Sequence, residues 1–317
     1  MKKALLILLS LATVLTSVPF FYPVRAADAV VYVSELSGND NNSGTTASAP
    51  LKTLEAAIRA VQNGGRIVLI GDVSLTGSDS SQYVEPEHTG KITISSENNA
   101  QLKLQSAMVY ALSGPTEFEN LTINTGSGNT VIAARFNDLV FGEGLEMTGS
   151  NLVVVGGYQT PTGTTPVGKD SNITIKSGKY NFIVGFSRSK GTKTLTYTGI
   201  SHITVYGGTI ATIYGASTIN HYSGSTDIKI YGGKVKMIYT GGDMTRRLNG
   251  TSNIELCGGE VTKLEINNAI GDTTIKLDGG KLSVLAESIY QNNADITKLA
   301  STATRSLSYN SLIYTKN

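Results

Sequence analysis

The sequence contains one cysteine, no tryptophan, seven prolines and few charged residues, and these scarcities exclude several kinds of protein. Because Cys257 has no second cysteine to pair with, an intrachain disulfide is impossible and packing must stabilise the fold. No proline-rich or charged linker divides the chain, which favours one elongated domain over two globular ones. Charged residues make up 16% of the chain, and no basic stretch indicates a nucleic-acid partner.

Glycine, by contrast, is abundant, with 35 residues, and threonine, isoleucine and valine are frequent. Glycine permits tight bends, and β-branched side chains fit the pleated surface of a strand. The composition therefore favours β structure with frequent turns, in a chain of 317 residues that is long enough to bury a large core.

The first residues have the features of a secretory signal. Two lysines precede the apolar run ALLILLSLATVLTSVPFFYP, and small residues at Val24–Ala26 and Ala27–Ala29 offer cleavage sites. The alternative is an uncleaved membrane anchor, but Pro19, Pro23 and the alanine-rich end of the run favour cleavage. We expect residues 1–26 to be removed, the protein to be secreted to an extracellular or cell-surface location, and no membrane partner to remain. Because this segment holds three basic residues and no acidic one, the formal net charge of +2 becomes slightly negative.

A short pattern occurs five times in the second half of the chain. Each copy has an apolar–polar–apolar triplet, then a glycine pair or Ser-Gly, then apolar residues at one position and again three positions later. The alternation predicts strands with one face in a core, and the glycine pair predicts a bend that needs positive φ or close packing against the next copy. The triplets are Ile173–Ile175, Ile203–Val205, Ile228–Ile230, Ile254–Leu256 and Ile275–Leu277.

A unit of this kind cannot bury its own apolar face, so successive units must stack. The triplets follow one another too closely for four-stranded propeller blades of about 40 residues, and the leucine and asparagine ladder of leucine-rich repeats is absent. We therefore predict an all-β fold, a single-stranded right-handed parallel β-helix whose rungs span 67–285, with 286–317 as a C-terminal cap or tail. Weaker rungs are predicted upstream at Ile67–Ile70, Ile92–Ile94, Leu102–Leu104, Leu121–Ile123, Leu139–Phe141 and Leu152–Val155.

Residues 27–66 are predicted to form an N-terminal strand and a short capping helix. Leu54, Ile58 and Val61 share one helix face, Thr53 can serve as N-cap and Gly64 can end the helix. Such a helix would cover the open end of the first rung, where apolar side chains and unpaired backbone are otherwise exposed.

This segment resembles the opening segment of secreted right-handed β-helix proteins of the pectate-lyase-like superfamily. The resemblance rests on Tyr32-Val33-Ser34, Gly38-Asn39-Asp40, Gly44-Thr45 and Pro50-Leu51-Lys52-Thr53-Leu54. Members are commonly polysaccharide lyases or glycoside hydrolases, which implies a carbohydrate substrate class and a polysaccharide partner. The matching residues belong to the cap of the fold and not to an active site.

The catalytic residues of that superfamily do not carry over. Its lyases pair a calcium-binding carboxylate cluster with a Lys or Arg base, and its hydrolases use paired carboxylates. This sequence has no Asp-Asp pair, no clustered carboxylates in consecutive rungs and no Arg-x-Pro-x-x-Arg string. The polar string Ser37–Gly44 has oxygen ligands for calcium but lacks the spacing of a calcium loop, so a structural Asx-rich turn is favoured and no metal or cofactor is predicted.

The longest connectors between rungs occur at one point of the repeat. Residues 158–170, 185–201, 215–227 and 241–252 are long, whereas 267–273 is short. Because equivalent connectors of a solenoid emerge on one side, these loops should share an edge and form the wall of a shallow cleft. The aromatic and polar residues on that edge are Tyr158, Arg188, Lys190, Lys193, His221, Tyr222, Asp243, Arg246 and Arg247.

Flat aromatic rings and charged donors are what a sugar-binding cleft needs, although solvated loop charges are the favoured explanation of the arginines. Weak catalytic candidates are Arg188, His221, Asp243, Arg246 and Arg247, with His221 as acid or base and Asp243 as its partner. Two tyrosine columns are also predicted, either as structural ladders or as a binding platform. The substrate-binding candidates are Tyr158, Tyr206, Tyr214, Tyr222, Tyr231 and Tyr239, with Tyr206 over Tyr231 and Tyr214 over Tyr239.

Two functions follow from these observations. The first is a secreted protein that engages polysaccharide, and if it is an enzyme, β-elimination by an Arg or Lys base on a uronate polymer fits the basic loops better than hydrolysis. The second is a non-catalytic structural or adhesive cell-surface protein, which the low charge and the absence of carboxylate clusters favour. The sequence defines neither the sugar nor the oligomeric state.

Overall fold

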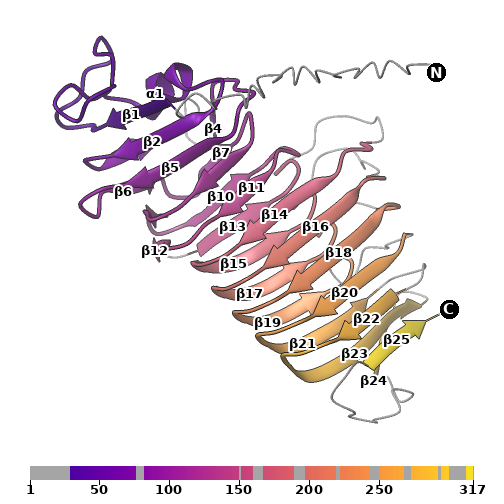
Figure 1. Cartoon of the computed structure of the whole chain (residues 1–317). Helices are drawn as coiled ribbons and strands as arrows, with labels where there is room; N and C mark the ends of the chain where they lie inside the picture. Colours follow the sequence, from indigo (N-terminus) through magenta and orange to yellow (C-terminus); the bar gives the residue numbers. More distant parts are fainter. Residues whose placement is uncertain are drawn as a thin grey trace, which may run out of the picture.

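The computed structural model describes residues 29–75, 82–149, 151–159, 167–188, 197–218, 222–242, 250–267, 273–291, 294–299 and 312–316. The chain winds into a parallel β-solenoid, as predicted (Figure 1). Antiparallel pairing occurs where β24 and β25 join the C-terminal end. No helix among the described residues is long and apolar enough to cross a membrane. The predicted signal segment 1–26 lies outside the described residues.

Three sheets run along the solenoid, and we name them A, B and C. Sheet A contains β1 (Ala29–Val33), β2 (Gly65–Leu69), β5 (Ile92–Ser96), β8 (Thr116–Phe118), β11 (Leu139–Phe141), β14 (Ser171–Ile175), β16 (Ile200–Val205), β18 (Ser225–Ile230), β20 (Ser252–Leu256), β22 (Thr273–Leu277) and β25 (Leu312–Lys316). Sheet B contains β3 (Val73–Leu75), β6 (Gln101–Leu104), β9 (Thr122–Asn124) and β12 (Glu146–Thr148). Sheet C contains β4 (Gln82–Val84), β7 (Val109–Ala111), β10 (Asn129–Ala133), β13 (Asn151–Val155), β15 (Lys179–Val184), β17 (Thr209–Tyr214), β19 (Lys234–Tyr239), β21 (Glu260–Asn267), β23 (Lys281–Gln291) and β24 (Ala294–Leu299).

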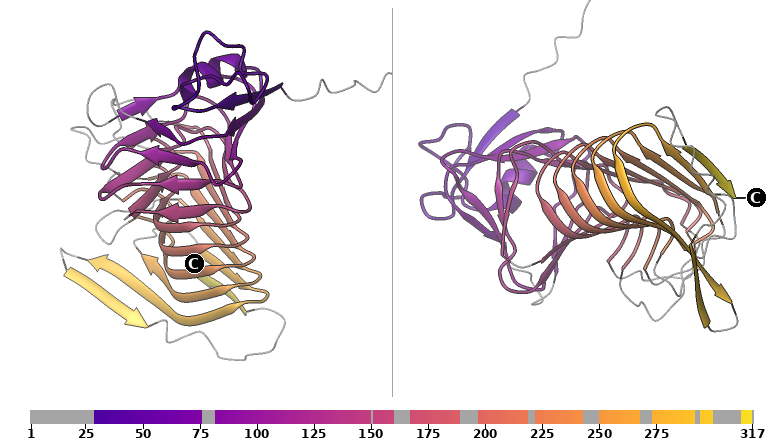
Figure 2. Two further views of the ribbon diagram at one scale, coloured as in Figure 1. Left: turned by 90° about the vertical axis from the view of Figure 1, so that its left-hand side faces the viewer. Right: turned by 90° about the horizontal axis from the view of Figure 1, so that it is seen from below.

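The turns of the solenoid are of two kinds. From β2 to β13 the chain visits sheets A, B and C in that order, so each turn has three strands. From β14 to β23 it passes from sheet A directly to sheet C through a glycine bend, so each turn has two strands. Sheet B therefore ends at β12, while sheets A and C continue (Figure 2).

The predicted repeat register is confirmed. Ile173, Ile203, Ile228, Ile254 and Ile275 are successive partners along sheet A. The apolar residues after each bend are partners in the same way along sheet C. The weaker upstream segments each coincide or overlap with a strand, but they are distributed over all three sheets and are not one per turn.

The two glycines of each pair have different structural roles. A Cβ on Gly207, the first of its pair, would lie 2.2 Å from the carbonyl oxygen of Lys176 in the preceding turn. Gly208, the second, has φ +85°, in the left-handed region that costs an ordinary residue energy. The first glycine permits neighbouring turns to approach, and the second permits the chain to reverse.

The core runs through both kinds of turn but differs in its side chains. The three-strand turns bury aromatic rings, and Phe118 stacks on Phe141 with centroids 5.6 Å apart. The two-strand turns after β15 fill the interior with isoleucine, valine and leucine, such as Ile203, Ile213 and Ile238.

Helix α1 (Leu54–Ala60) lies beside β1 at the N-terminal end of the solenoid (Figure 1). The Thr53 side chain accepts a hydrogen bond from the Ala56 amide, and Leu54, Ala57 and Ile58 are buried. The preceding polar string forms a turn in which the Asp40 carboxylate accepts hydrogen bonds from the amides of Lys52 and Thr53. Strand β1 pairs with β2, so the N-terminal segment adds a strand to sheet A.

One buried polar cluster lies in the three-strand turns. Glu85 and His88 are almost fully buried, and His88 Nε2 lies 3.2 Å from Glu85 Oε2. His88 Nδ1 faces the Gly90 carbonyl oxygen at 3.0 Å. The Tyr110 hydroxyl and the Ser113 amide both donate to the Glu85 carboxylate. Because both imidazole nitrogens face acceptors, the arrangement suits a protonated His88 that donates to Glu85 and to the Gly90 carbonyl.

Candidate functional site

The long connectors do begin and end in register at one edge of the solenoid. Tyr197 bridges Val167 on one side and Tyr222 on the other, each in parallel fashion. Phe186 and Ala216 pack with Tyr197 and Tyr222 in a small buried cluster separate from the main core. This cluster anchors the bases of the loops.

Tyr222 belongs to that anchor and does not present a ring to solvent. It is 1% exposed, and its hydroxyl oxygen lies 2.5 Å from the carbonyl oxygens of both Gly199 and Ser225. Burial raises the pKa of its hydroxyl above the ordinary value. Tyr222, a predicted substrate-binding residue of the loop edge, is therefore buried in the loop base. Several other predicted loop residues lie outside the described residues, namely Lys190, Lys193, His221, Asp243, Arg246 and Arg247.

Four residues form a surface on the outer face of sheet C where the connectors begin, and we call them the loop-edge strip: Phe182, Arg188, Tyr214 and Tyr239. Tyr214 stacks on Tyr239 with centroids 5.1 Å apart and ring planes 5° apart. Phe182 lies 6.0 Å from Tyr214 in a tilted arrangement. The Arg188 guanidinium carbon lies 5.2 Å from the centre of the Phe182 ring.

The charged guanidinium of Arg188 packs against the Phe182 ring. Burial lowers the pKa of its guanidinium, and the Tyr214 hydroxyl has a smaller opposing effect. Within the described part of the chain its guanidinium has no ion pair and no hydrogen bond. A half-buried cation over a ring face is attracted to the ring quadrupole, and it retains donors that a ligand can use.

Tyr158 lies at the start of the first long connector, apart from the strip. Its ring meets Phe136 edge-on at 5.4 Å, and the Arg135 guanidinium carbon lies 5.8 Å from its centre. It is half-buried. Tyr158 therefore extends the anchoring aromatic cluster toward solvent.

The second predicted tyrosine column is confirmed as a stack, but on another face. Tyr206 and Tyr231 lie 5.1 Å apart with ring planes 10° apart, and they are 52% and 44% exposed. They follow β16 and β18 at the glycine-bend end of sheet A, whereas the loops meet these strands at the opposite end. Stacking covers one face of each ring.

Part of the outer face of sheet A is a ladder of paired polar groups. Asp227 accepts a hydrogen bond from Asn253 at 3.0 Å, and His202 Nδ1 and Lys229 Nζ lie 3.2 and 3.4 Å from its other oxygen. Asn172 donates to Asp138 in the same manner. These groups satisfy one another.

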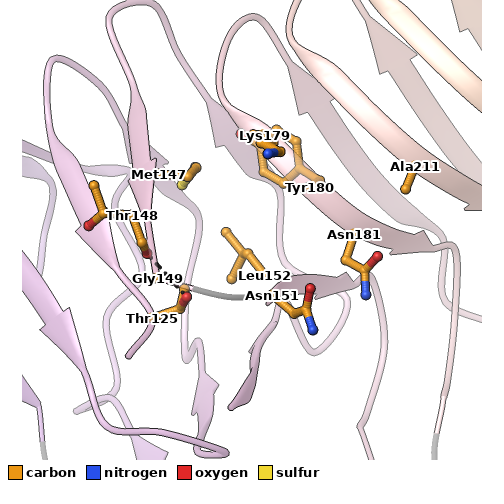
Figure 3. Close-up of a pocket in the computed structure, with 10 residues that line it drawn as sticks. All are labelled: Thr125, Met147, Thr148, Gly149, Asn151, Leu152, Lys179, Tyr180, Asn181 and Ala211. Carbon is orange, nitrogen blue, oxygen red and sulfur yellow. Dashed lines mark hydrogen bonds between the residues drawn. The ribbon is translucent and has the colours of Figure 1, made fainter. Parts of the chain in front are cut away.

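A pocket of about 140 Å³ lies on the bend side of sheet C, and we call it the step pocket (Figure 3). It opens where sheet B ends and the two-strand turns begin. Strand β12, the last of sheet B, contributes to one wall, β13, β15 and β17 contribute to the others, and Thr125 after β9 and Gly149 after β12 complete the lining. Its lining residues are Thr125, Met147, Thr148, Gly149, Asn151, Leu152, Lys179, Tyr180, Asn181 and Ala211.

The step pocket combines an apolar base with polar groups. Tyr180 is 2% exposed and donates its hydroxyl to the Ser177 carbonyl, so its ring serves as packing. The side chains of Asn151, Asn181 and Lys179 make no hydrogen bond or ion pair in the described part of the chain. No carboxylate lines the pocket, and no group of three or more His, Cys, Asp or Glu that suits a metal occurs among the described residues.

Sequence patterns did not predict the step pocket. Asn151 and Asn181 read as ordinary polar positions of strands, and the pocket depends on where a sheet ends. The signal available was the first glycine bend at Ser177–Gly178, which marks the change in cross-section.

No protein-family model matches the chain, and no curated protein and no solved structure has significant similarity to it. Of the predicted resemblance, the structure shows the parallel solenoid, and the comparisons do not support the pectate-lyase-like superfamily. A function must therefore be argued from the surfaces just described.

Proposed function

We propose that this protein is a secreted, polysaccharide-engaging solenoid that holds a sugar chain against the outer face of sheet C. The observation that carries the proposal is the loop-edge strip, in which three aromatic rings and one guanidinium lie along successive turns. Aromatic side chains supply apolar contact with one polar end, and guanidinium supplies charge-assisted hydrogen bonds. A linear polymer laid along the solenoid axis would meet these groups in sequence.

Arg188 favours an acidic polymer within this class. Its guanidinium is partly desolvated and has no counter-ion among the described residues, so a carboxylate from the ligand would supply the missing partner. If the bound chain is also cleaved, elimination by an Arg or Lys base fits better than hydrolysis, because no pair of carboxylates lies among the described residues of the strip or the step pocket. Chain cleavage is a separate outcome of the same experiment.

The test incubates the mature protein with a panel of neutral and uronate polysaccharides. Binding is measured by affinity electrophoresis, chain shortening by size exclusion, and an unsaturated product by its ultraviolet absorbance. We expect at least one polymer to bind, and Arg188→Gln and Tyr214→Ala to weaken that binding about tenfold. Lys236→Ala is the matched control, because Lys236 is an exposed sheet C residue outside the strip. Equal affinity of all variants, or no binding at all, would contradict the proposal.

The second candidate is a non-catalytic structural or adhesive protein, and the outer face of sheet A favours it. There His202 and Asn253 both pair with the Asp227 carboxylate, so these polar groups bind one another and stabilise the stacked turns. If no polysaccharide binds or is shortened, this second function is the one supported.

A further inference from the structure

The step pocket arises because one sheet ends before the other two. Strand β12 pairs with β9 on one side and is the terminal strand of sheet B. The next turn replaces the third strand by a bend at Ser177–Gly178, where the Ser177 hydroxyl donates to the Gly142 carbonyl and accepts from the Leu145 amide. β12 thus overhangs the bend. An edge strand also presents unpaired backbone groups on its open side.

Two side-chain amides come together beneath this overhang. Asn151 on β13 and Asn181 on β15 lie next to each other and point the same way (Figure 3). Neither amide has a hydrogen-bond partner in the described part of the chain, although each is partly buried. Polar groups in such places usually find partners in protein or water. Two unused amides, each with donors and an acceptor, are therefore available to one ligand.

The chemistry of the pocket is that of a polyol site. Its apolar base comes from Met147, Leu152 and the Tyr180 ring, and its polar wall comes from carboxamides and the Thr125 and Thr148 hydroxyls. The Thr125 hydroxyl already donates to the Thr148 carbonyl at 3.2 Å and keeps its acceptor capacity. Adjacent ring hydroxyls present donor and acceptor pairs that a carboxamide can match, while the ring carbons meet the apolar base.

The size of the pocket limits its occupant. About 140 Å³ corresponds to roughly five water molecules, below the 300–1,000 Å³ typical of sites that enclose a drug-sized ligand. An oligosaccharide could not be enclosed, but one sugar ring could be seated with the rest of the chain outside. Asn181 precedes Phe182 of the loop-edge strip on the same strand, so one bound chain can reach both surfaces.

We propose that the step pocket is a subsite for a single pyranose unit, recognised through neighbouring ring hydroxyls by the amides of Asn151 and Asn181. The inference rests on the proposed function and makes it specific: the strip binds the length of the chain, and the step pocket positions one unit. Lys179, which is exposed, adds a donor at the rim.

The experiment uses the full mature chain and two kinds of ligand. The first is a set of monosaccharides, namely glucose, galactose, mannose and glucuronate, added at millimolar concentration while the side-chain amide signals of Asn151 and Asn181 are followed by NMR. The second is the polymer that binds best in the panel. We expect one or more monosaccharides to shift both amide signals, and Asn151→Ala with Asn181→Ala to weaken polymer binding about tenfold.

A second variant fills the pocket without removing a donor. Ala211 lines the pocket and follows Asn181 in the outward column of sheet C, one turn before Lys236, which carries a long side chain there. Ala211→Trp should therefore fold and abolish the monosaccharide shifts. Lys236→Ala and Thr262→Ala, which change outward residues of the same column outside the pocket, should leave the shifts and the affinity unchanged. Circular dichroism checks that every variant is folded.

The outcomes separate the inference from the proposed function. If the polymer binds and is weakened by strip variants but not by pocket variants, the subsite is wrong and the proposed function stands. If no monosaccharide moves either amide signal, the subsite is wrong as well. If neither polymer nor monosaccharide binds, both are overturned.

Discussion

The three-strand turns from β2 to β13 and the two-strand turns from β14 to β23 share sheets A and C but close differently. In the first region a third strand separates the two sheets and widens the interior. In the second a glycine bend brings them together. The width of the interior then selects its residues, because close packing requires side chains that fill the available space. Phe118, Phe141 and Tyr110 occupy the wide region, and isoleucine, valine and leucine occupy the narrow one after β15.

The two regions also differ in what else they bury. The wide region has room for the Glu85–His88–Tyr110 cluster, whereas the described inward positions of the narrow region after β15 are aliphatic or hydroxylic. The free energy of unfolding of a solenoid is approximately a sum over its turns and their interfaces. A substitution in one region should therefore lower the stability of the turns around it and leave the other region unchanged. Amide hydrogen exchange, which reads each segment separately, is therefore the suitable measurement.

The largest effect is expected in the wide region. Glu85→Ala leaves His88 buried without its carboxylate and removes the acceptor of Tyr110. Breaking a buried pair in this way costs about 3–5 kcal/mol. Exchange should accelerate in β4, β7 and β10 and remain slow in β18 and β20. Equal acceleration in both regions would show that the solenoid unfolds as one unit and would contradict the local account.

The same cluster predicts a pH dependence confined to the wide region. Burial lowers the pKa of His88, but Glu85 and the Gly90 carbonyl outweigh it, and the net effect is a raised pKa. A raised folded-state pKa stabilises the fold fully below the unfolded value of about 6.5, and this stabilisation is lost as pH rises through the folded pKa. Amide protection of β4 and β7, after correction for intrinsic exchange rates, should therefore fall as the pH rises from the unfolded-state pKa of His88 through its folded-state pKa.

His88→Gln is the control for this titration. The glutamine amide can donate to one acceptor but does not titrate. At acidic pH, amide protection near β4 should therefore be lower in the variant than in the wild type, and it should not change as the pH rises. A wild-type profile as flat as that of the variant would contradict a charged His88.

The narrow region depends on its bends. A Cβ on Gly258 would lie 2.1 Å from the Tyr231 carbonyl oxygen of the preceding turn, so Gly258→Ala must push two turns apart. We expect a loss of about 2–3 kcal/mol, as for overpacked positions. Exchange should accelerate in β18 and β20 while β5 and β8 stay protected. Thr262→Ala, a nearby exposed control, should change little.

These bends explain how far the fold could be predicted from the sequence. The repeat predicts which residues pair between neighbouring strands of sheet A, because the same bend follows each first isoleucine at the same distance. These isoleucines are Ile173, Ile203, Ile228, Ile254 and Ile275. The wide region has no such marker. Its turns are closed by a third short strand, and segments such as Leu102–Leu104 and Leu139–Phe141 look alike although they belong to different sheets.

The candidate site was predictable only in part, for a related reason. Spacing within a strand predicts which residues share a face, so the Tyr206–Tyr231 and Tyr214–Tyr239 stacks followed from the repeat. It does not define which residues of a connector turn inward, so the burial of Tyr222 could not be predicted in this way. The step pocket depends on the junction between two cross-sections, which no single strand encodes.

A smaller effect tests whether an exposed stack contributes to stability. Tyr231→Ala removes the ring that lies 5.1 Å from Tyr206 on the outer face of the narrow region. Aromatic pairs contribute about 0.5–1.5 kcal/mol beyond area burial, and this pair is partly solvated, so a loss of about 1 kcal/mol is expected. Tyr231→Phe should retain most of it. A loss as large as that of Gly258→Ala would mean that the stack, and not the bend, holds these turns together.

The smallest expected effect compares one surface ion pair from each region. Arg66 Nη1 lies 2.6 Å from Glu119 Oε1 in the wide region and also donates to Ser95 at 3.2 Å. Lys234 Nζ lies 3.9 Å from Glu260 Oε2 in the narrow region, where both side chains are more exposed. Double-mutant cycles to alanine, read by hydrogen exchange, should give a coupling of about 0.5–1 kcal/mol for the first pair and about zero for the second. Added salt should reduce the first coupling, because partly exposed charges are screened. Comparable couplings would show that the wider cross-section confers no advantage on polar contacts at the surface, and the difference between the two regions would then lie entirely in their interiors and bends.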